Sequence, residues 1–217
     1  APSRAVDSVI DLGASLSMAH GMELAGAGER SGRPVVGVIG DSTFAHSGIT
    51  SLLGTVYNGG KGTLCILDNR TTAMTGAQGN PCNGVTLDEQ ARGVSPLDVP
   101  AGKPLDIVEL CRALGVDEVT LVDSQDAGEI RQALEEAVAH TDKLSVLVFR
   151  SPCRLIDRSR RPQPVIEGCQ GCGTCIQIGC PALGRDEDEL AVIDPNQCIG
   201  CNQCVQSCPF GCIQKGE

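Results

Sequence analysis

The chain has 217 residues, with 27 acidic side chains, 17 basic side chains and a formal net charge of −10. Most of such a surface would repel phosphates, and no apolar run approaches the length of a membrane span, so we expect neither a nucleic-acid partner nor a membrane segment. The first residues carry no secretory leader pattern and the 13 cysteines suit a reducing compartment, so we expect a cytoplasmic protein.

Apolar runs alternate with helical periods through residues 1–163. Four short apolar runs predict strands buried on both faces of a parallel sheet, at residues 35–40, 63–67, 118–122 and 144–149. Apolar spacing, acidic caps and glycine stops predict four helices, at residues 15–25, 48–57, 106–114 and 125–139. The alternation predicts parallel pairing and a layered α/β domain, whose ligand lies outside the carboxyl ends of the strands.

Polar turns follow the first two predicted strands. Gly40-Asp41-Ser42 leads from the first strand into a helix, and Asn69 and Thr71 follow the second strand. Magnesium prefers oxygen ligands and commonly bridges carboxylates to phosphates, so Asp41, the amide oxygen of Asn69 and the carbonyl of Thr71 are candidate Mg2+ ligands. The helix N-terminus after Ser42 would help to balance the charge of a diphosphate.

Two cysteine runs near the C-terminus have the spacing of a ferredoxin with two 4Fe-4S clusters. In such proteins three closely spaced thiolates hold one cluster, and the fourth ligand comes from the other run. The first cluster is therefore expected on Cys169, Cys172, Cys175 and Cys208. The second cluster is expected on Cys180, Cys198, Cys201 and Cys204. Disulfides need an oxidising compartment and zinc sites usually take pairs of ligands, so both alternatives are weaker.

The cysteine density rises abruptly near residue 164, which predicts two domains, residues 1–163 and residues 164–217. The second is expected to be a small ferredoxin-like α+β domain that needs its clusters in order to fold. Basic residues and prolines between positions 154 and 164 predict a linker at the end of the first domain. Cys212 lies near enough to the second run to serve as a spare thiol, but a structural role is favoured.

Residues 40–49 and 68–76, with residues 11–22 upstream, resemble the diphosphate-binding domain of the 2-oxoacid:ferredoxin oxidoreductases. Within that superfamily the chain most resembles the large subunit of indolepyruvate ferredoxin oxidoreductase, which also ends in a two-cluster ferredoxin domain. The resemblance implies oxidative decarboxylation of arylpyruvates to acyl-coenzyme A, with electrons passing through two 4Fe-4S clusters to an external ferredoxin. Two alternatives stay open: another 2-oxoacid such as pyruvate or 2-oxoglutarate, or an electron carrier without catalysis of its own.

The same resemblance implies roles for individual residues. Gly40, Ser42 and Thr43 would line the diphosphate of thiamine diphosphate, beside the three candidate Mg2+ ligands. His46 would lie near the reacting centre as a proton donor or a contact to the substrate carboxylate, although a helix-capping or diphosphate-contacting histidine fits equally well. Thiamine enzymes bind the cofactor between two domains, so the resemblance also implies a pyrimidine-binding domain with an activating glutamate outside this chain, a smaller β subunit and an oligomer.

Overall fold

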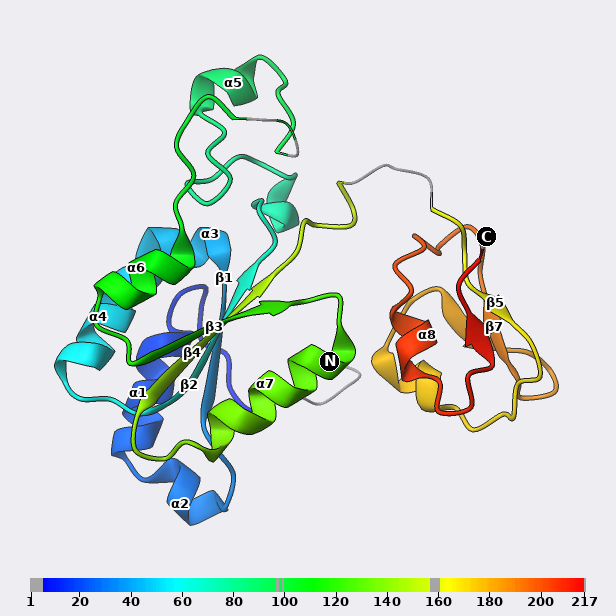
Figure 1. Ribbon diagram of the computed structural model, residues 1–217, viewed down its shortest axis with the longest axis horizontal. Coiled ribbons are helices and arrows are strands. Elements are labelled where there is room, and N and C mark those ends of the chain that lie inside the picture. The colour runs from blue at the N-terminus through cyan, green and yellow to red at the C-terminus, as the bar shows by residue number, and fades with distance from the viewer. Residues whose placement is uncertain (1–5, 97, 99, 157–160, 217) are drawn as a thin grey trace. The chain divides into compact units, whose positions relative to one another are not determined.

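The computed structural model describes residues 6–96, 98, 100–156 and 161–216. These residues form two compact units, one of residues 9–156 and one of residues 6–8 with 161–216 (Figure 1). The predicted linker includes residues 157–160, which lie outside the described residues. In the described ranges, no helix is long and apolar enough to cross a membrane.

The larger unit is built on a parallel sheet whose strands occupy the four predicted positions. These strands are β1 (Val36–Gly40), β2 (Gly62–Asp68), β3 (Glu118–Asp123) and β4 (Leu144–Arg150). Their order in the sheet is β1-β2-β4-β3. Gly40 pairs with Leu67 and Asp68 pairs with Arg150, so the polar residues at the ends of three strands reach the same edge. The predicted parallel α/β domain is confirmed.

The predicted helices are present as α1 (Ser15–Leu24), α4 (Ile49–Tyr57), α6 (Ile107–Ala113) and α7 (Ala127–Ala139). Asp106 and Asp126 cap α6 and α7, because each carboxylate accepts two backbone N–H groups of the first turn. Two further helices, α2 (Ala27–Ser31) and α5 (Leu87–Ala91), are not predicted, since five residues are too few to show a helical period.

Helical structure after β1 begins at Asp41, in agreement with the prediction that Gly40-Asp41-Ser42 leads into a helix. The start at residue 48 that the apolar spacing predicts is too late. α3 (Asp41–Thr43), a π-helical turn (Phe44–Gly48) and α4 form one continuous run. The π-helical turn breaks the 3.6-residue spacing, which conceals the first part of the run from a periodicity argument. As a result, the helix N-terminus lies directly at the carboxyl end of β1.

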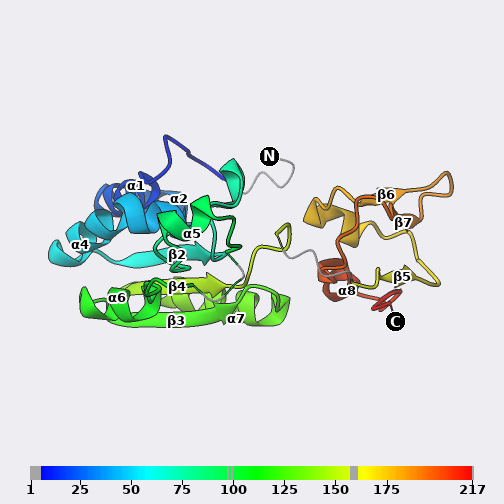
Figure 2. The same ribbon diagram turned by 90° about the horizontal axis from the view of Figure 1, so that it is seen from above.

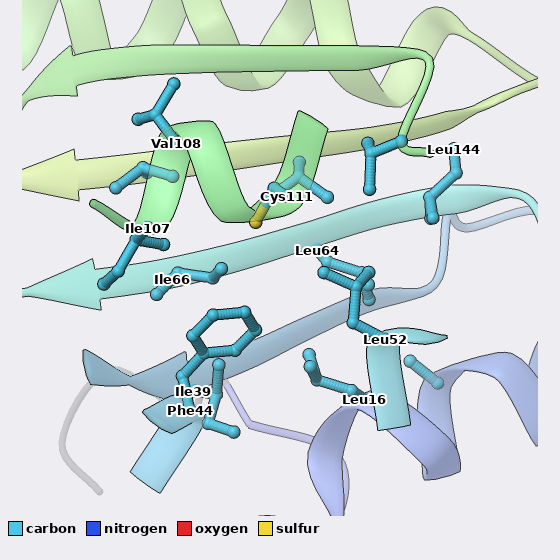
Figure 3. Packing of buried hydrophobic residues seen from close by; sticks show 14 of the residues in the cluster. Leu16, Ile39, Phe44, Leu52, Leu64, Ile66, Ile107, Val108, Cys111 and Leu144 are labelled. Atoms are coloured by element: carbon cyan, nitrogen blue, oxygen red, sulfur yellow. The ribbon is translucent and has the colours of Figure 1, made fainter. Parts of the chain in front are cut away.

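Apolar side chains pack on both faces of β4, at the centre of the sheet. In β1 the burial alternates and Val36 and Val38 are exposed, so the prediction that this strand is buried on both faces is wrong. One cluster packs α1, α4 and α6 against the sheet, and its fully buried members include Leu16, Phe44 and Leu52 (Figure 3). α7 covers the opposite face, where Ala133 packs in a second cluster with Phe149 of β4. Figure 1 shows α4 and α6 on one side of the sheet and α7 on the other. This packing fixes the strand ends that carry the polar turns.

The cysteine-rich unit is a small α+β fold (Figure 2). Its antiparallel pairs are β5 (Val165–Ile166) with β8 (Ile213–Gln214), and β6 (Leu183–Arg185) with β7 (Ala191–Ile193). Its helices are a 3-10 helix (Thr174–Ile178) and α8 (Gln203–Ser207). Thiols make up part of the small apolar cluster, in which Cys175 and Cys204 are buried. Because this apolar cluster is small, apolar packing alone gives the unit little stability.

Candidate functional site

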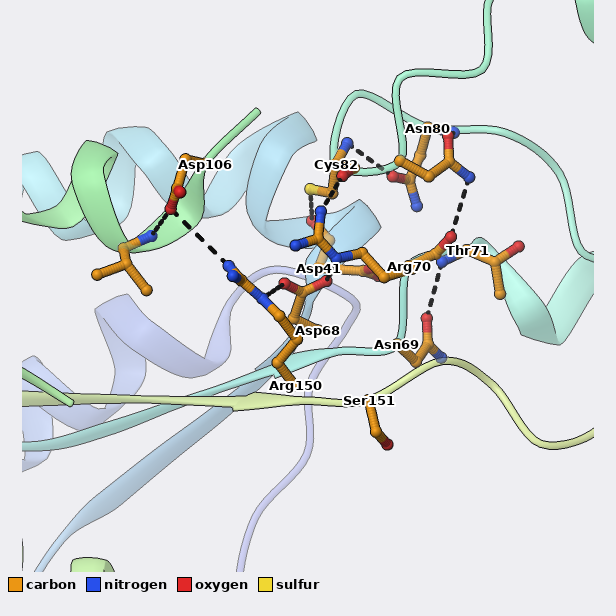
Figure 4. Close-up of polar contacts among 12 residues, drawn as sticks. Asp41, Asp68, Asn69, Arg70, Thr71, Asn80, Cys82, Asp106, Arg150 and Ser151 are labelled. Carbon is orange, nitrogen blue, oxygen red and sulfur yellow. Dashed lines mark hydrogen bonds and ion pairs between the residues drawn. The ribbon is translucent and has the colours of Figure 1, made fainter. Parts of the chain in front are cut away.

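Asp41 lies at the carboxyl end of β1 and is only 2% exposed (Figure 4). Its Oδ1 accepts the Ser42 N–H at 2.6 Å. Its Oδ2 is buried and has no hydrogen-bond partner among the described residues. An unpaired buried carboxylate oxygen is costly, and a bound cation removes that cost. The Asp41 Oδ2 atom is therefore available as a metal ligand.

Burial raises the pKa of the Asp41 carboxyl from 3.8 to about 6. The Ser42 N–H opposes this rise in pKa, whereas the neighbouring Asp68 carboxylate adds to it. The Arg70 N–H and the Asn80 amide also lower this pKa. Loss of water disfavours the charged form, and a cation beside the carboxylate favours it again. The environment of Asp41 therefore fits a hard cation such as Mg2+.

The turn after β2 carries the other two proposed Mg2+ ligands. Asn69 Oδ1 accepts the Thr71 N–H at 3.1 Å, and the Thr71 hydroxyl donates to the Gln78 carbonyl at 3.1 Å. β1 and β2 are neighbouring strands, so this turn lies beside Asp41. No group of three His, Cys, Asp or Glu side chains in the described residues is arranged to hold a metal ion. A set of one carboxylate, one amide and one carbonyl leaves coordination positions for a diphosphate and water.

Asp68, next to this turn, is buried between two arginines. Its Oδ2 accepts the Arg150 Nε–H at 2.7 Å, and its Oδ1 lies 3.5 Å from Arg70 Nε. Arg150 Nη2 also lies 3.8 Å from Oδ1 of Asp106, the N-cap of α6. Arg70 has a φ of 62° and donates through Nη1 to the Cys82 carbonyl at 2.6 Å. These contacts hold the ends of β2, β4 and α6 together.

Hydroxyl and amide groups connect the two polar turns to the loop that follows them. The Thr72 hydroxyl donates to Ser42 Oγ at 2.8 Å, and Asn80 Nδ2 lies 3.4 Å from Thr72 Oγ1. Asn80 Oδ1 accepts the Cys82 N–H at 2.8 Å, and the Cys82 thiol lies 3.6 Å from the Asp41 carbonyl oxygen. This network couples the loop to the carboxylate that would bind the metal.

Asn80, Cys82 and Arg150 belong to this site but are not among its predicted residues. The sequence could have indicated Arg150, because this residue directly follows a predicted strand. The carboxyl ends of parallel strands meet at one edge of the sheet, where the ligand binds. No sequence pattern indicates Asn80 or Cys82, because the 3-10 turn Ala73–Thr75 and an irregular loop separate them from β2. Their positions depend on side-chain hydrogen bonds that no sequence period reports.

The remaining predicted residues lie at the end of β1 and on the helical run after it. Gly40 ends β1, with open space beside its α-carbon, and Thr43 lies in the first helical turn. His46 is exposed on the π-helical turn, and no described residue forms a hydrogen bond with its ring. Gly13 has a φ of 113°, and a β-carbon there would overlap Ser47 Oγ, so only glycine lets this upstream loop approach the π-helical turn. π-Helical turns within α-helices are frequent at functional sites.

The cysteine-rich unit brings each predicted cysteine set together. The first set lines one cavity, with Cys169, Cys172, Cys175 and Cys208. In the second set, burial and the nearby thiols of Cys201, Cys198 and Cys180 together raise the pKa of the Cys204 thiol to about 11. The four cysteines of the first set thus line one cavity, and those of the second set lie near one another. Their assignment to two clusters stays a prediction.

Polar groups surround the cavity of the first set. Cys169 Sγ lies 3.5 Å from the Gly171 N and 3.4 Å from the Ala191 N, and both N–H groups donate to it. Arg185 also lines the cavity and pairs through Nη1 with Glu189 Oε2 at 2.5 Å. N–H groups and cations beside the sulfurs stabilise the reduced, more negative state of an iron–sulfur cluster. The donor set and its surroundings therefore fit a 4Fe-4S cluster.

Comparison with known proteins gives matches over both units. The thiamine pyrophosphate enzyme family, C-terminal TPP binding domain, matches residues 2–149, and the 4Fe-4S binding domain family matches residues 191–214. The chain is 36% identical to indolepyruvate oxidoreductase subunit IorA of Pyrococcus horikoshii, over 99% of the chain and 34% of that protein. IorA of Methanothermobacter marburgensis is also 36% identical, over 98% of the chain and 32% of that protein. The chain spans about a third of the length of these curated relatives.

Among solved structures, the thiamine diphosphate-dependent 4-hydroxybenzoylformate decarboxylase of Rhodococcus jostii RHA1 aligns with 65% of this chain and 23% of its own. That alignment has a TM-score of 0.42 and 26% identity.

The family match covers more than half of the chain and includes both polar turns of the candidate metal site. The IorA relatives confirm the resemblance to the large subunit of indolepyruvate ferredoxin oxidoreductase. The chain therefore belongs to the thiamine pyrophosphate enzyme family, as a C-terminal TPP-binding domain followed by a 4Fe-4S binding domain.

Proposed function

We propose that this chain is the cofactor-binding and electron-transferring part of a 2-oxoacid oxidoreductase. The observation that carries the proposal is the buried Asp41 Oδ2, without a hydrogen-bond partner among the described residues, at the strand ends of a TPP-binding domain. The same chain carries two gathered cysteine sets, which give electrons from such a reaction somewhere to go. We further propose two 4Fe-4S clusters on these sets.

In this proposal Asp41, Asn69 and the Thr71 carbonyl hold Mg2+. Gly40, Ser42 and Thr43 line the diphosphate, because free backbone N–H groups at the start of a helical run favour an anion. When bound, thiamine diphosphate supplies the electron sink that a 2-oxoacid needs in order to lose carbon dioxide.

Further along the same run, His46 donates or holds a proton near the substrate carboxylate. Its exposure on the π-helical turn leaves the ring accessible to a substrate. Support for a catalytic role comes from this position alone, and a diphosphate contact is the competing role.

The proposed substrate is an arylpyruvate such as indolepyruvate, with coenzyme A as the acyl acceptor and a ferredoxin as the electron acceptor. Six curated relatives named indolepyruvate oxidoreductase subunit IorA, 34–36% identical to this chain, support the substrate class. Coenzyme A, ferredoxin, a β subunit and a cytoplasmic location follow from the family resemblance. Pyruvate and 2-oxoglutarate are the competing substrates.

The activating glutamate is proposed to come from a pyrimidine-binding part outside these 217 residues. Glu89 is the buried glutamate of the described residues, and its carboxylate is already occupied. Its Oε2 accepts the Thr86 N–H at 2.8 Å, and its Oε1 accepts the Ala101 N–H at 2.7 Å. The relatives are about three times as long as the matched region, which leaves room for such a part.

The proposal is tested by the visible absorbance of the anaerobically purified, cluster-loaded chain, complemented with the part of a full-length relative that it does not span. With Mg2+, thiamine diphosphate and coenzyme A present, indolepyruvate is expected to bleach the absorbance faster than pyruvate or 2-oxoglutarate. Asp41→Asn is expected to abolish this bleaching while dithionite still bleaches both proteins. Bleaching by dithionite but by none of the three 2-oxoacids would contradict the enzyme function and favour a plain electron carrier.

Arg185 provides a further test of the first cluster. Arg185→Gln is expected to lower the reduction potential of that cluster by an amount on the order of tens of millivolts, because the guanidinium beside the sulfurs favours the reduced state. Glu189→Gln removes the paired negative charge and is expected to shift the same potential upward. Redox titration followed by electron paramagnetic resonance (EPR) measures both shifts, and shifts of the same sign would contradict the electrostatic role.

A further inference from the structure

Cys212 is a fifth thiol in the cavity of the first cysteine set. Cys169, Cys172, Cys175, Cys208 and Cys212 all line that cavity. Three other cysteines outside the two sets, Cys65, Cys82 and Cys111, belong to apolar clusters of the α/β unit. Cys212 is 9% exposed and belongs to no apolar cluster of the described residues. Its place beside four other thiols distinguishes Cys212 from these three core cysteines.

The local backbone holds Cys212 beside Cys208. Gly211 has a φ of 67°, and its N–H donates to the Cys208 carbonyl at 3.3 Å, which closes a tight turn between the two cysteines. The Glu167 N–H donates to the Cys212 carbonyl at 2.9 Å. The Cys212 thiol lies 3.1 Å from the Gly168 carbonyl oxygen, to which it donates. Cys212 is therefore held in place beside the cavity, with its thiol donating to a backbone carbonyl.

We propose that Cys212 is a reserve ligand of the first cluster and replaces Cys208 as the fourth thiolate. This inference rests on the proposed cluster assignment and adds a second coordination state to it. In the exchange, the iron–sulfur bond to Cys208 breaks and a bond from the same iron to Cys212 forms. The proton of the Cys212 thiol passes to the Cys208 thiolate, so no electron is gained or lost.

The second cluster offers an internal comparison. Cys180 precedes a proline in the first run just as Cys208 does in the second, and each is the fourth ligand of the other run's cluster. Among the described residues, the thiols that contribute most to the raised pKa of Cys204 are the other three of its own set, Cys201, Cys198 and Cys180. Loss of Cys180 should therefore leave an iron without a cysteine ligand, whereas loss of Cys208 should not.

The test uses the full, anaerobically purified chain as Cys208→Ala, Cys212→Ala, the double variant and Cys180→Ala. Iron content and EPR spectra of oxidised and reduced samples are measured. Cys208→Ala and Cys212→Ala are each expected to keep the iron content of the unchanged protein, with Cys208→Ala shifting the reduced spectrum. The double variant and Cys180→Ala are expected to lose one iron from one cluster and to show a three-iron signal when oxidised.

A three-iron signal from Cys208→Ala alone would overturn the proposal, as would full iron content in the double variant. If Cys180→Ala has no effect on iron content, the cluster assignment itself is wrong and the reserve ligand falls with it. Cys208→Ser covers the case in which the alanine variant does not fold. Resonance Raman spectra should show only sulfur ligation in Cys208→Ser and oxygen ligation in Cys208→Ser with Cys212→Ala; oxygen ligation in the single variant would also overturn the proposal.

Discussion

Asp41→Asn is expected to weaken Mg2+-dependent thiamine diphosphate binding by about 100-fold or more, while making the ligand-free chain more stable. The binding loss follows because the amide keeps the shape of the carboxylate but lacks the charge that a hard cation needs. The gain in stability follows because the carboxylate is buried and its Oδ2 has no hydrogen-bond partner among the described residues. A site built for a cation is thus a liability to the fold when the cation is absent.

The stability of the ligand-free chain is expected to depend on pH through Asp41, with a definite sign. The pKa of Asp41 rises from 3.8 to about 6 on folding, so the folded chain binds more protons than the unfolded chain between these values. The stabilising contribution of the protonated form is fully present below pH 3.8 and is lost as the pH rises through about 6. We therefore expect the stability advantage of Asp41→Asn over the ligand-free unchanged protein to be about 1–3 kcal/mol at pH 7 and to shrink by about 1 kcal/mol at pH 5.

Calorimetric titration measures the binding, and hydrogen–deuterium exchange of β1, β2 and β4 in increasing urea measures the stability of the α/β unit. Asp88→Asn is the matched control, since it makes the same chemical change on an exposed helix residue paired with Arg92. That control should alter neither thiamine diphosphate binding nor the exchange of these strands. An Asp41→Asn protein that binds the cofactor normally would show that Asp41 is not a metal ligand.

The sequence alone was sufficient to predict those residues of the site that directly follow a strand. Asp41 and Asn69 directly follow apolar runs, so the rule that ligands lie at the carboxyl ends of parallel strands predicted where they meet. The crossed cysteine sets were predictable for a similar reason, because the spacing of each triplet fits one cluster. Each of these residues lies a short distance along the chain from the strand or the cysteines that position it.

Other features depend on contacts between segments that no regular spacing connects. The loop that carries Asn80 and Cys82 is placed by hydrogen bonds to Thr72 and to Arg70. The π-helical turn conceals the early start of the helix at Asp41, since it departs from the 3.6-residue period. Sequence proximity allowed Cys212 as a spare thiol but favoured a structural role, and only the packed structure places it in the cavity of the first cysteine set.

Arg150→Met is expected to lower the free energy of unfolding of the α/β unit by about 3–5 kcal/mol. The Asp68 side chain is fully buried and accepts the Arg150 Nε–H at 2.7 Å. Without this arginine, its nearest described cation is Arg70, 3.5 Å away. The cost arises mainly because a charge is left buried with too little compensation, not because the pair itself is worth that amount. Arg150 also reaches Asp106, so its loss is expected to loosen the start of α6.

A second substitution separates these effects. Asp68→Asn combined with Arg150→Met removes both charges of the main pair, and it is expected to recover most of the stability lost in Arg150→Met. Arg112→Met, in an exposed pair with Glu109, should change the free energy of unfolding by about 0.5 kcal/mol or less. Hydrogen–deuterium exchange of β2, β4 and α6 in urea measures the free energy of unfolding of the α/β unit in all three variants. If the double variant is no more stable than Arg150→Met, the buried charge of Asp68 is not the cause, and the packing of the Arg150 side chain across the strand ends must account for the loss.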